Sequence, residues 1–199
     1  MVQEIATPLG LRDTKGGTQL DSSEMSRRAQ GYTRTGSPGS FAIDSEPACY
    51  PSACLYSTLD DMLRYLAYDM GQANTPLNSL RDDLFQWRQA SVSGNGVGLD
   101  WNIGLLPGTN ETFIWKTGSV FSGFVSYIGF VPSHEVGVTL LINTQDFVPD
   151  ALGQQILKFL LTNPSQELDL VRPHRQLIPI QQIPRGPGPV ENRPNMYQK

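Results

Sequence analysis

The stretch Phe113-Ile114-Trp115-Lys116-Thr117-Gly118-Ser119, followed by an apolar segment at residues 123–131, decides the fold of this chain. Its apolar and aromatic residues predict a strand, which Lys-Thr-Gly-Ser closes. A lysine there offers a fixed positive charge to a carboxylate, and Thr117 adds a hydroxyl. Gly118 lets a ligand approach the backbone, and the amide of Ser119 can point at an oxyanion. An exposed lysine before a turn fits the same three letters, so the context has to decide.

The segments around this stretch predict an antiparallel sheet. Strands are expected at residues 99–106, 112–116, 124–131 and 136–143, and residues 91–98 form a glycine-rich connector. Short connections between successive strands favour a meander. A helix at residues 149–161 has one apolar face and would lie across the sheet. The expected fold class is α+β, with a helical and irregular region ahead of the sheet.

The earlier part of the chain contains a clear amphipathic helix. Ser57-x-x-Asp60 has the form of a capping box, an apolar stripe follows, and Gly71 is placed to end the helix. A second, less regular helix is expected at residues 77–89. Pro8 and Gly10 should break any helix in residues 2–11. Residues 13–40 are interpreted as a long irregular excursion with Tyr32 as its anchor.

Composition limits the function. The chain has 199 residues, a net charge of -4, and 39% hydrophobic and 17% charged residues. Positive charge gathers after Val171, so the body is acidic, which argues against a nucleic-acid groove there. No apolar run is long enough to span a membrane, and the first residues do not resemble a signal peptide. Cys49 and Cys54 make neither a disulfide framework nor a metal site, and their redox state stays open.

Two regions are expected. Residues 1–165 would form one domain, and residues 166–199 a proline-rich, mobile tail. The tail could bind a partner groove, although a solvated terminus is the simpler interpretation. His134 and His174 lie in a turn and in the tail, so neither is assigned a role.

Two segments resemble one known family. Pro8-Leu9-Gly10-Leu11-x-Asp13-Thr14 resembles the Pro-Leu-Gly-Met-x-Asp-Thr segment of class C β-lactamases and the related D-alanyl-D-alanine carboxypeptidases. Leu55-Tyr56-Ser57-Thr58-x-Asp60-Asp61-Met62 is similar to that family's Tyr-Ser-Thr-x-x-Asp-Met helix start.

Three further segments follow in the order of the family. Residues 96–101 resemble its Gly-Leu-Gly-Trp strand. Residues 116–119, 123–124 and 128–132 match its Lys-Thr-Gly segment and the strand behind it, and residues 138–143 resemble its Gly-Val-x-Leu-Leu-x-Asn strand. The resemblance to the serine β-lactamase and penicillin-binding protein superfamily covers about residues 2–162, and it corresponds to the C-terminal part only.

The resemblance implies an acyl-transfer site that works without metal or cofactor. Lys116 and Thr117 would hold a substrate carboxylate, Gly118 would admit the substrate, and the Ser119 amide would form half of an oxyanion hole. Asn143 and Gln145 stand where class C enzymes have Asn-x-Asn as a carboxylate contact. Phe121 is interpreted as a lid over the site, and a place in the core is the alternative. Family members are usually periplasmic or extracellular, but this chain leaves its compartment unknown.

The family's nucleophile motif does not occur in these 199 residues. No serine has a lysine three positions later, and there is no Tyr-x-Asn. A serine hydroxyl needs a base to act as a nucleophile near neutral pH, so we expect no activity from this chain alone. The partners would be a small-molecule or peptide substrate, and a complementary N-terminal half or a second copy. Alternatives are a non-catalytic binding protein of the same fold and a truncated gene product without function.

Overall fold

The computed structural model describes residues 2–40, 55–83, 96–120 and 122–163, which all lie in one compact unit, Met1–Pro164. Several expectations fall outside the described residues: Cys49 and Cys54, the second half of the helix at residues 77–89, Phe121, and the tail. Of that helix, residues 78–83 are helical, as expected.

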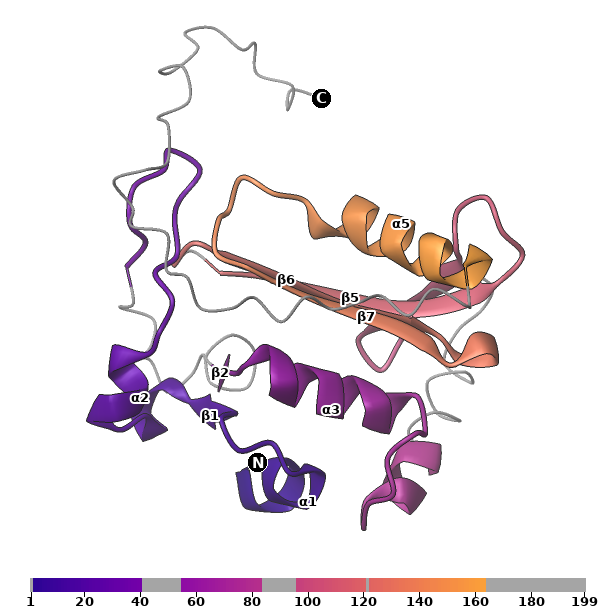
Figure 1. Cartoon of the computed structure of the whole chain (residues 1–199), viewed down its shortest axis with the longest axis horizontal. Helices are drawn as coiled ribbons and strands as arrows, with labels where there is room; N and C mark the ends of the chain where they lie inside the picture. Colours follow the sequence, from indigo (N-terminus) through magenta and orange to yellow (C-terminus); the bar gives the residue numbers. More distant parts are fainter. Residues whose placement is uncertain (1, 41–54, 84–95, 121, 164–199) are drawn as a thin grey trace, which may run out of the picture. The chain divides into compact units, whose positions relative to one another are not determined.

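The centre of this unit is a five-stranded antiparallel sheet in which every strand pairs with its neighbours along the chain (Figure 1). The predicted meander is therefore confirmed. The strands are β3 (Gly96–Gly98), β4 (Trp101–Leu105), β5 (Thr112–Val120), β6 (Phe124–Val131) and β7 (Val136–Ile142).

Two strand predictions were wrong. The strand that carries Lys-Thr-Gly does not end at Lys116, because β5 continues through the motif to Val120 and pairs with β6 along this whole length. Residues 96–98 are not part of a connector, since they pair with β4 through a two-residue turn. In that turn Leu99 and Asp100 both have positive φ, 49° and 68°, as a tight hairpin with the twist of its strands requires.

The helix α5 (Pro149–Thr162) covers one face of the sheet, as predicted (Figure 1). A buried cluster joins them: Leu106, Phe113, Val131 and Leu157. Phe113 and Trp115 stack on the same face, with ring centroids 4.0 Å apart. Burying these side chains supplies most of the attraction between helix and sheet.

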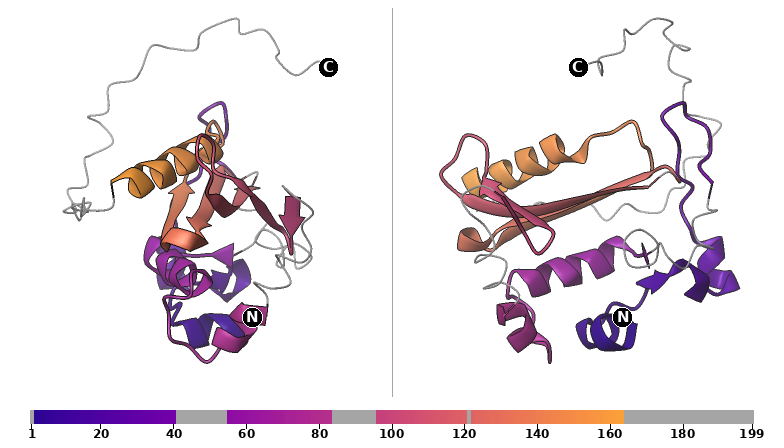
Figure 2. Two further views of the ribbon diagram at one scale, coloured as in Figure 1. Left: turned by 90° about the vertical axis from the view of Figure 1, so that its right-hand side faces the viewer. Right: turned by 180° about the vertical axis from the view of Figure 1, so that it is seen from behind.

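The helix α3 (Leu59–Asp69) packs on the opposite face of the sheet, and the left view of Figure 2 looks along this helix. Its Leu66 joins a second buried cluster with Ile103, Ile114, Ile128 and Phe130. The helix approaches β7 closely at Gly137, where an added Cβ would lie 2.9 Å from the Leu66 side chain. The N-cap is Thr58 rather than Ser57, and Gly71, with φ of 81°, follows the C-cap residue Met70.

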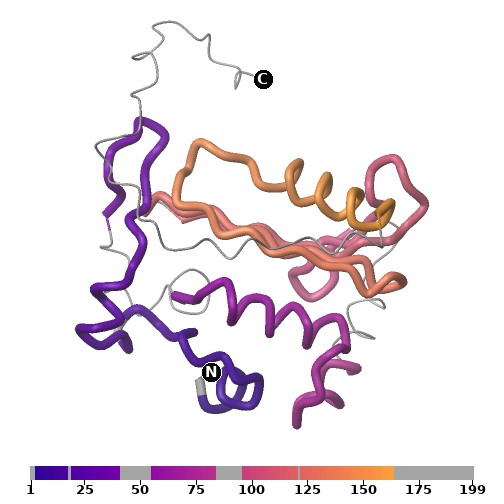
Figure 3. Tube along the Cα trace, viewed as in Figure 1, coloured from indigo at the N-terminus to yellow at the C-terminus, as the bar shows by residue number. Residues whose placement is uncertain are grey.

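The N-terminal residues run under α3 (Figure 3). The expected break at Pro8 was wrong, because Val2–Ala6 (η1) and Thr7–Leu9 (α1) form helical turns. Pro8 occupies the first turn of α1, where the backbone N–H that proline lacks would have no partner within the helix. Gly10 ends them at φ of 69°. Leu9 and Leu11 pack with Tyr68 of α3.

Residues 13–40, which were expected to be irregular, contain some regular secondary structure. They contain β1 (Lys15–Gly16), η2 (Gly17–Gln19) and α2 (Ser22–Ser26), and β1 pairs with β2 (Leu55–Tyr56). Tyr32 is an anchor through its backbone: its N–H lies 2.9 Å from the carbonyl oxygen of Asn143, and its carbonyl accepts from Gln145 N.

Candidate active site

Side chains of the Lys-Thr-Gly strand alternate between the two faces of the sheet. Lys116 lies opposite Ile128, which packs in the cluster under α3. Thr117 lies opposite Tyr127, against which Gly153 of α5 packs. Because directly paired residues share a face, Lys116 and Gly118 are on the α3 side and Thr117 is on the α5 side. The sheet therefore separates the two side chains that were expected to hold one carboxylate.

The Lys116 ammonium is already paired. Its Nζ lies 2.8 Å from Oδ1 of Asp100, in the turn between β3 and β4. The lysine side chain is 41% exposed and the aspartate side chain 84% exposed. The charge of Lys116 is thus accessible from solvent, and its counter-ion belongs to the same chain.

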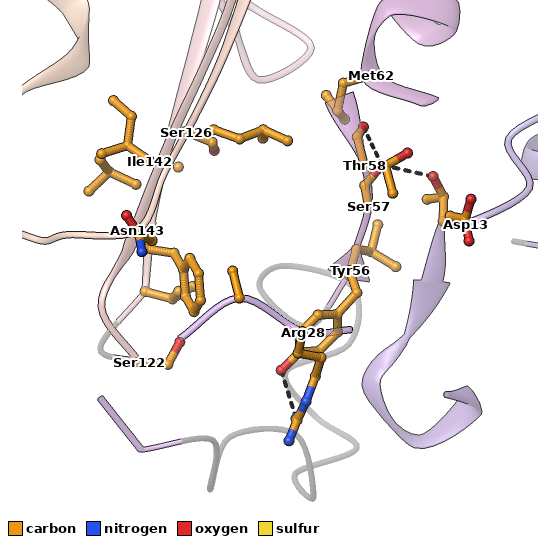
Figure 4. Close-up of a pocket in the computed structure, with 18 of the residues that line it drawn as sticks. Asp13, Arg28, Tyr56, Ser57, Thr58, Met62, Ser122, Ser126, Ile142 and Asn143 are labelled. Carbon is orange, nitrogen blue, oxygen red and sulfur yellow. Dashed lines mark hydrogen bonds between the residues drawn. The ribbon is translucent and has the colours of Figure 1, made fainter. Parts of the chain in front are cut away.

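A cavity of about 660 Å³ opens on the α3 side of the sheet, between the start of α3 and the ends of β5, β6 and β7 (Figure 4). Gly118, Ser119 and Asn143 are among its lining residues, whereas Lys116, Thr117 and Gln145 are not. The structure therefore brings three of the expected site residues to the cavity and leaves three beside it.

The backbone amide of Ser119 points away from β6. The carbonyl oxygen of Val120 accepts from Gly123 N at 3.1 Å, so the polar backbone groups of Val120 face β6. These groups alternate in direction along a strand, so the N–H of Ser119 faces the other edge of β5. The neighbouring strand β4 pairs with β5 only as far as Trp115. The described residues place no strand against the Ser119 amide.

Asn143 and Gln145 hold loops together. Nδ2 of Asn143 donates to the carbonyl oxygen of Gln30 at 2.9 Å, and Nε2 of Gln145 donates to that of Val120 at 2.6 Å. Gln145 thus fixes the backbone at the end of β5, and Asn143 fixes the backbone at Gln30. Each amide group has a second N–H donor, so a substrate would share these groups with the bonds already made.

The far wall of the cavity comes from segments to which the sequence assigned no role. Asp13, Thr14, Arg28, Tyr56 and Ser57 line it, and Figure 4 shows Tyr56 and Ser57 across the cavity from Ser126 and Ile142. The available signal was the Pro-Leu-Gly-Leu-x-Asp-Thr and Tyr-Ser-Thr motifs, which supplied the resemblance but not a site.

A buried carboxylate organises this wall. Asp61 is 3% exposed, and its oxygens accept from Arg12 N, Asp13 N and the hydroxyl of Thr14, the last at 2.7 Å. The Thr14 hydroxyl also lies 2.9 Å from Ser57 Oγ, at the cavity surface. Asp61 therefore joins the N-terminal segment to the first turn of α3.

Several serine hydroxyls line the cavity: Ser57, Ser119, Ser122 and Ser126. Within the described ranges, none of these serines hydrogen-bonds to a lysine; Lys15 pairs with Glu24 and Lys116 with Asp100.

His134, to which the sequence assigned no role, contacts an acidic side chain. Its Nε2 lies 3.1 Å from Glu111 Oε1, and Ser133 donates to the other oxygen of the same carboxylate at 2.8 Å. These hydrogen bonds from Ser133 and His134 lower the pKa of Glu111. The serine bonds to the glutamate and not to the histidine, so this is no nucleophile–base pair.

Among the described residues, no group of three or more histidine, cysteine or acidic side chains could hold a metal ion. None of the helices in the described part is long and apolar enough to cross a membrane.

An antiparallel sheet between helices, with a Lys-Thr-Gly strand beside a cavity, defines the class of β-lactamase-like proteins. The family model described as Beta-lactamase matches residues 1–162. The chain belongs to this family and corresponds to its C-terminal part. A search of curated protein sequences gave no match.

Solved structures agree on the fold. A class C β-lactamase has a TM-score of 0.65 and 20% identity, with 82% of this chain and 50% of that chain covered. The D-alanine carboxypeptidase AmpC from Burkholderia cenocepacia has a TM-score of 0.63 and 21% identity, with 81% and 53% covered. The octameric penicillin-binding protein homologue from Pyrococcus abyssi has a TM-score of 0.60 and 21% identity, with 80% and 36% covered. The chain thus spans about half the length of the first two.

Proposed function

We propose that this chain supplies the Lys-Thr-Gly wall of a β-lactamase-related serine hydrolase and is inactive alone. The reaction would be acyl transfer on a β-lactam, a D-alanyl peptide or another ester or amide. Lys116 would attract the substrate carboxylate, and the Ser119 amide would stabilise the oxyanion. The motif does not distinguish between these substrates.

The observation that best supports this proposal is that the backbone N–H of Ser119 points away from β6. In the described part of the chain no strand pairs with this N–H, which lies next to a cavity and three residues from an accessible lysine. Such a donor can receive a carbonyl oxygen that develops negative charge. Gly118 lines the cavity, and an added Cβ there would meet Ser126 Oγ at 2.7 Å. A larger residue at this position would crowd the cavity wall.

Inactivity of the chain alone is the first test. The purified chain should neither hydrolyse a chromogenic cephalosporin nor take a covalent label from fluorescent penicillin. An oxyanion hole has nothing to stabilise without an activated nucleophile. Stoichiometric labelling that survives denaturation would refute the proposal and would direct attention to the serines that line the cavity.

Complementation is the second test. A family fragment with Ser-x-x-Lys and Tyr-x-Asn, supplied in trans or by fusion, should restore hydrolysis. Lys116→Ala should then reduce activity on carboxylated substrates by about tenfold or more, since a lost charge-assisted hydrogen bond costs about 1.5–3 kcal/mol. Lys158→Ala is the control, because Lys158 is an exposed lysine on α5. Equal losses with and without a substrate carboxylate would remove Lys116 from the site.

A non-catalytic binding protein is the second candidate. The described residues contain no lysine bonded to a cavity serine, and the Lys116 charge is already balanced by Asp100. Ligand binding without labelling or turnover, even after complementation, would favour this candidate. The coding sequence upstream of Met1 discriminates further: an in-frame Ser-x-x-Lys and Tyr-x-Asn would favour the hydrolase.

A further inference from the structure

Asp100 occupies an unusual place for an acidic residue. It is the second residue of the two-residue turn between β3 and β4, with φ of 68°. Glycine adopts this left-handed region most easily, and asparagine and aspartate are the side chains that tolerate it best. The turn brings the carboxylate to 2.8 Å from Lys116 Nζ, on the α3 side of the sheet.

The proposed function has the Lys116 ammonium bind a substrate carboxylate, but the carboxylate of Asp100 already contacts this ammonium. An ammonium group has three donors, so Asp100 does not exhaust them. The pair is nevertheless neutral, and this reduces the long-range attraction of Lys116 for an anion. An incoming carboxylate must share the ammonium with Asp100 or displace it.

We infer that Asp100 is a specificity-determining residue that competes with ligand carboxylates for Lys116. The inference rests on the proposed role of Lys116. Asp100 lowers the affinity for ligands with a free carboxylate and leaves uncharged ligands unaffected. The difference in affinity between a carboxylic acid and its amide is therefore smaller than it would be for a site with Lys116 and without Asp100.

The exposure of the pair sets the size of the effect. Side chains that are 41% and 84% exposed are strongly hydrated, and such ion pairs contribute little. Removing the charge of Asp100 should therefore tighten binding of a carboxylated ligand by about two- to fivefold. The exposed aspartate can also swing into solvent, so the wild-type chain should still bind such a ligand.

The experiment is a titration of the full chain with N-acetyl-D-alanyl-D-alanine and with its C-terminal amide, followed by ligand-observed NMR. Asp100→Asn removes the charge and tolerates the same backbone conformation. Asp100→Gly is a second variant that removes the charge without any cost at positive φ. Both should bind the acid about two- to fivefold tighter than wild type, and the amide equally well. Circular dichroism and thermal unfolding confirm that each variant is folded.

The Lys116→Gln background separates the two hypotheses. There, Asp100→Asn should no longer change the affinity for the acid. If wild type, Asp100→Asn and Asp100→Gly bind the acid equally while Lys116→Gln weakens it, the inference about Asp100 is wrong and the role of Lys116 stands. If neither wild type nor Asp100→Asn prefers the acid over the amide, the role of Lys116 fails, and the inference fails with it.

Discussion

Asp61 is the residue on which the far wall of the cavity depends most. Its buried carboxylate accepts from two backbone amides and the Thr14 hydroxyl. An amide nitrogen accepts no hydrogen bond, so Asp61→Asn leaves at least one of these three donors without its partner. We expect the free energy of unfolding to fall by about 1–3 kcal/mol, measured by urea denaturation.

Asp60→Asn is the matched control for this prediction. Asp60 lies in the same first turn of α3, close to the same helix dipole, but its side chain is exposed. Its substitution should change the free energy of unfolding by less than about 0.5 kcal/mol. Equal losses for both variants would mean that the dipole, and not the buried hydrogen bonds, accounts for the effect.

The sequence pointed to candidate site residues but did not predict how the strand arranges them. Lys116 and Thr117 adjoin in sequence, yet a strand directs them to opposite faces once it continues through the motif. From the sequence, Asp61 was expected only to lie at the start of a helix. Its hydrogen bonds to Arg12 and Asp13 join segments far apart in the chain, and no local pattern encodes such a contact.

An ion pair between Lys15 and Glu24 joins β1 to the short helix α2. The shifted pKa values of these two groups make the contribution of this pair to stability depend on pH. Glu24 accepts from Lys15 Nζ at 2.5 Å and from the backbone N–H of Asp21. The hydrogen bond from Lys15, and then that from Asp21, lower the pKa of Glu24 below its ordinary 4.5. The hydrogen bond to Glu24 raises the pKa of Lys15 above 10.5.

The sign of the pH dependence follows from these directions. A depressed carboxyl pKa contributes stability that is present above 4.5 and lost as the pH falls through the folded pKa. The raised lysine pKa contributes below 10.5 and is lost above its own folded pKa. We therefore expect wild type to exceed Glu24→Gln in unfolding free energy at about pH 7, and this difference to disappear in acid.

Urea denaturation of both proteins at several pH values tests this prediction. Glu4→Gln is the control, because Glu4 is an exposed carboxylate in η1. Its unfolding free energy should follow that of wild type throughout. A difference between wild type and Glu24→Gln that persists unchanged into strong acid would show that Glu24 acts through its shape and not its charge.

Among the elements, the sheet was predicted well and its hairpins less well. The apolar runs of β6 and β7 are strong signals, and their bounds agree to within one residue. The turn between β3 and β4 was missed because Leu99-Asp100 lacks the glycine or asparagine that usually marks positive φ. The cavity was not predictable, since it forms where α3 and the strand ends face each other across distant parts of the chain.

The edge of the sheet at β7 bears on how the chain behaves in solution. Within the described ranges, β7 pairs only with β6, and Val136–Ile142 carries no charge. Native edge strands normally carry charge, proline or a bulge that prevents pairing with another chain. Exposed apolar side chains also occur on both flanking helices: Leu59 and Leu63 on α3, and Leu152 and Phe159 on α5. We propose that β7 pairs with a second copy or with a complementary half.

A lysine on this edge should therefore reduce self-association. Val138 is a poor site for it, because Val138 packs against the cluster under α5. Leu141 is 45% exposed and suits the test better. In sedimentation over a concentration series, wild type should grow in mass, and Leu141→Lys should shift toward the monomer because its charge must be desolvated on pairing.

Leu105→Lys is the matched control, since Leu105 is 54% exposed on the inner strand β4, and this variant should associate like wild type. A wild-type chain that stays monomeric and melts cooperatively would contradict the need for a second chain and would favour an independently folded binding protein.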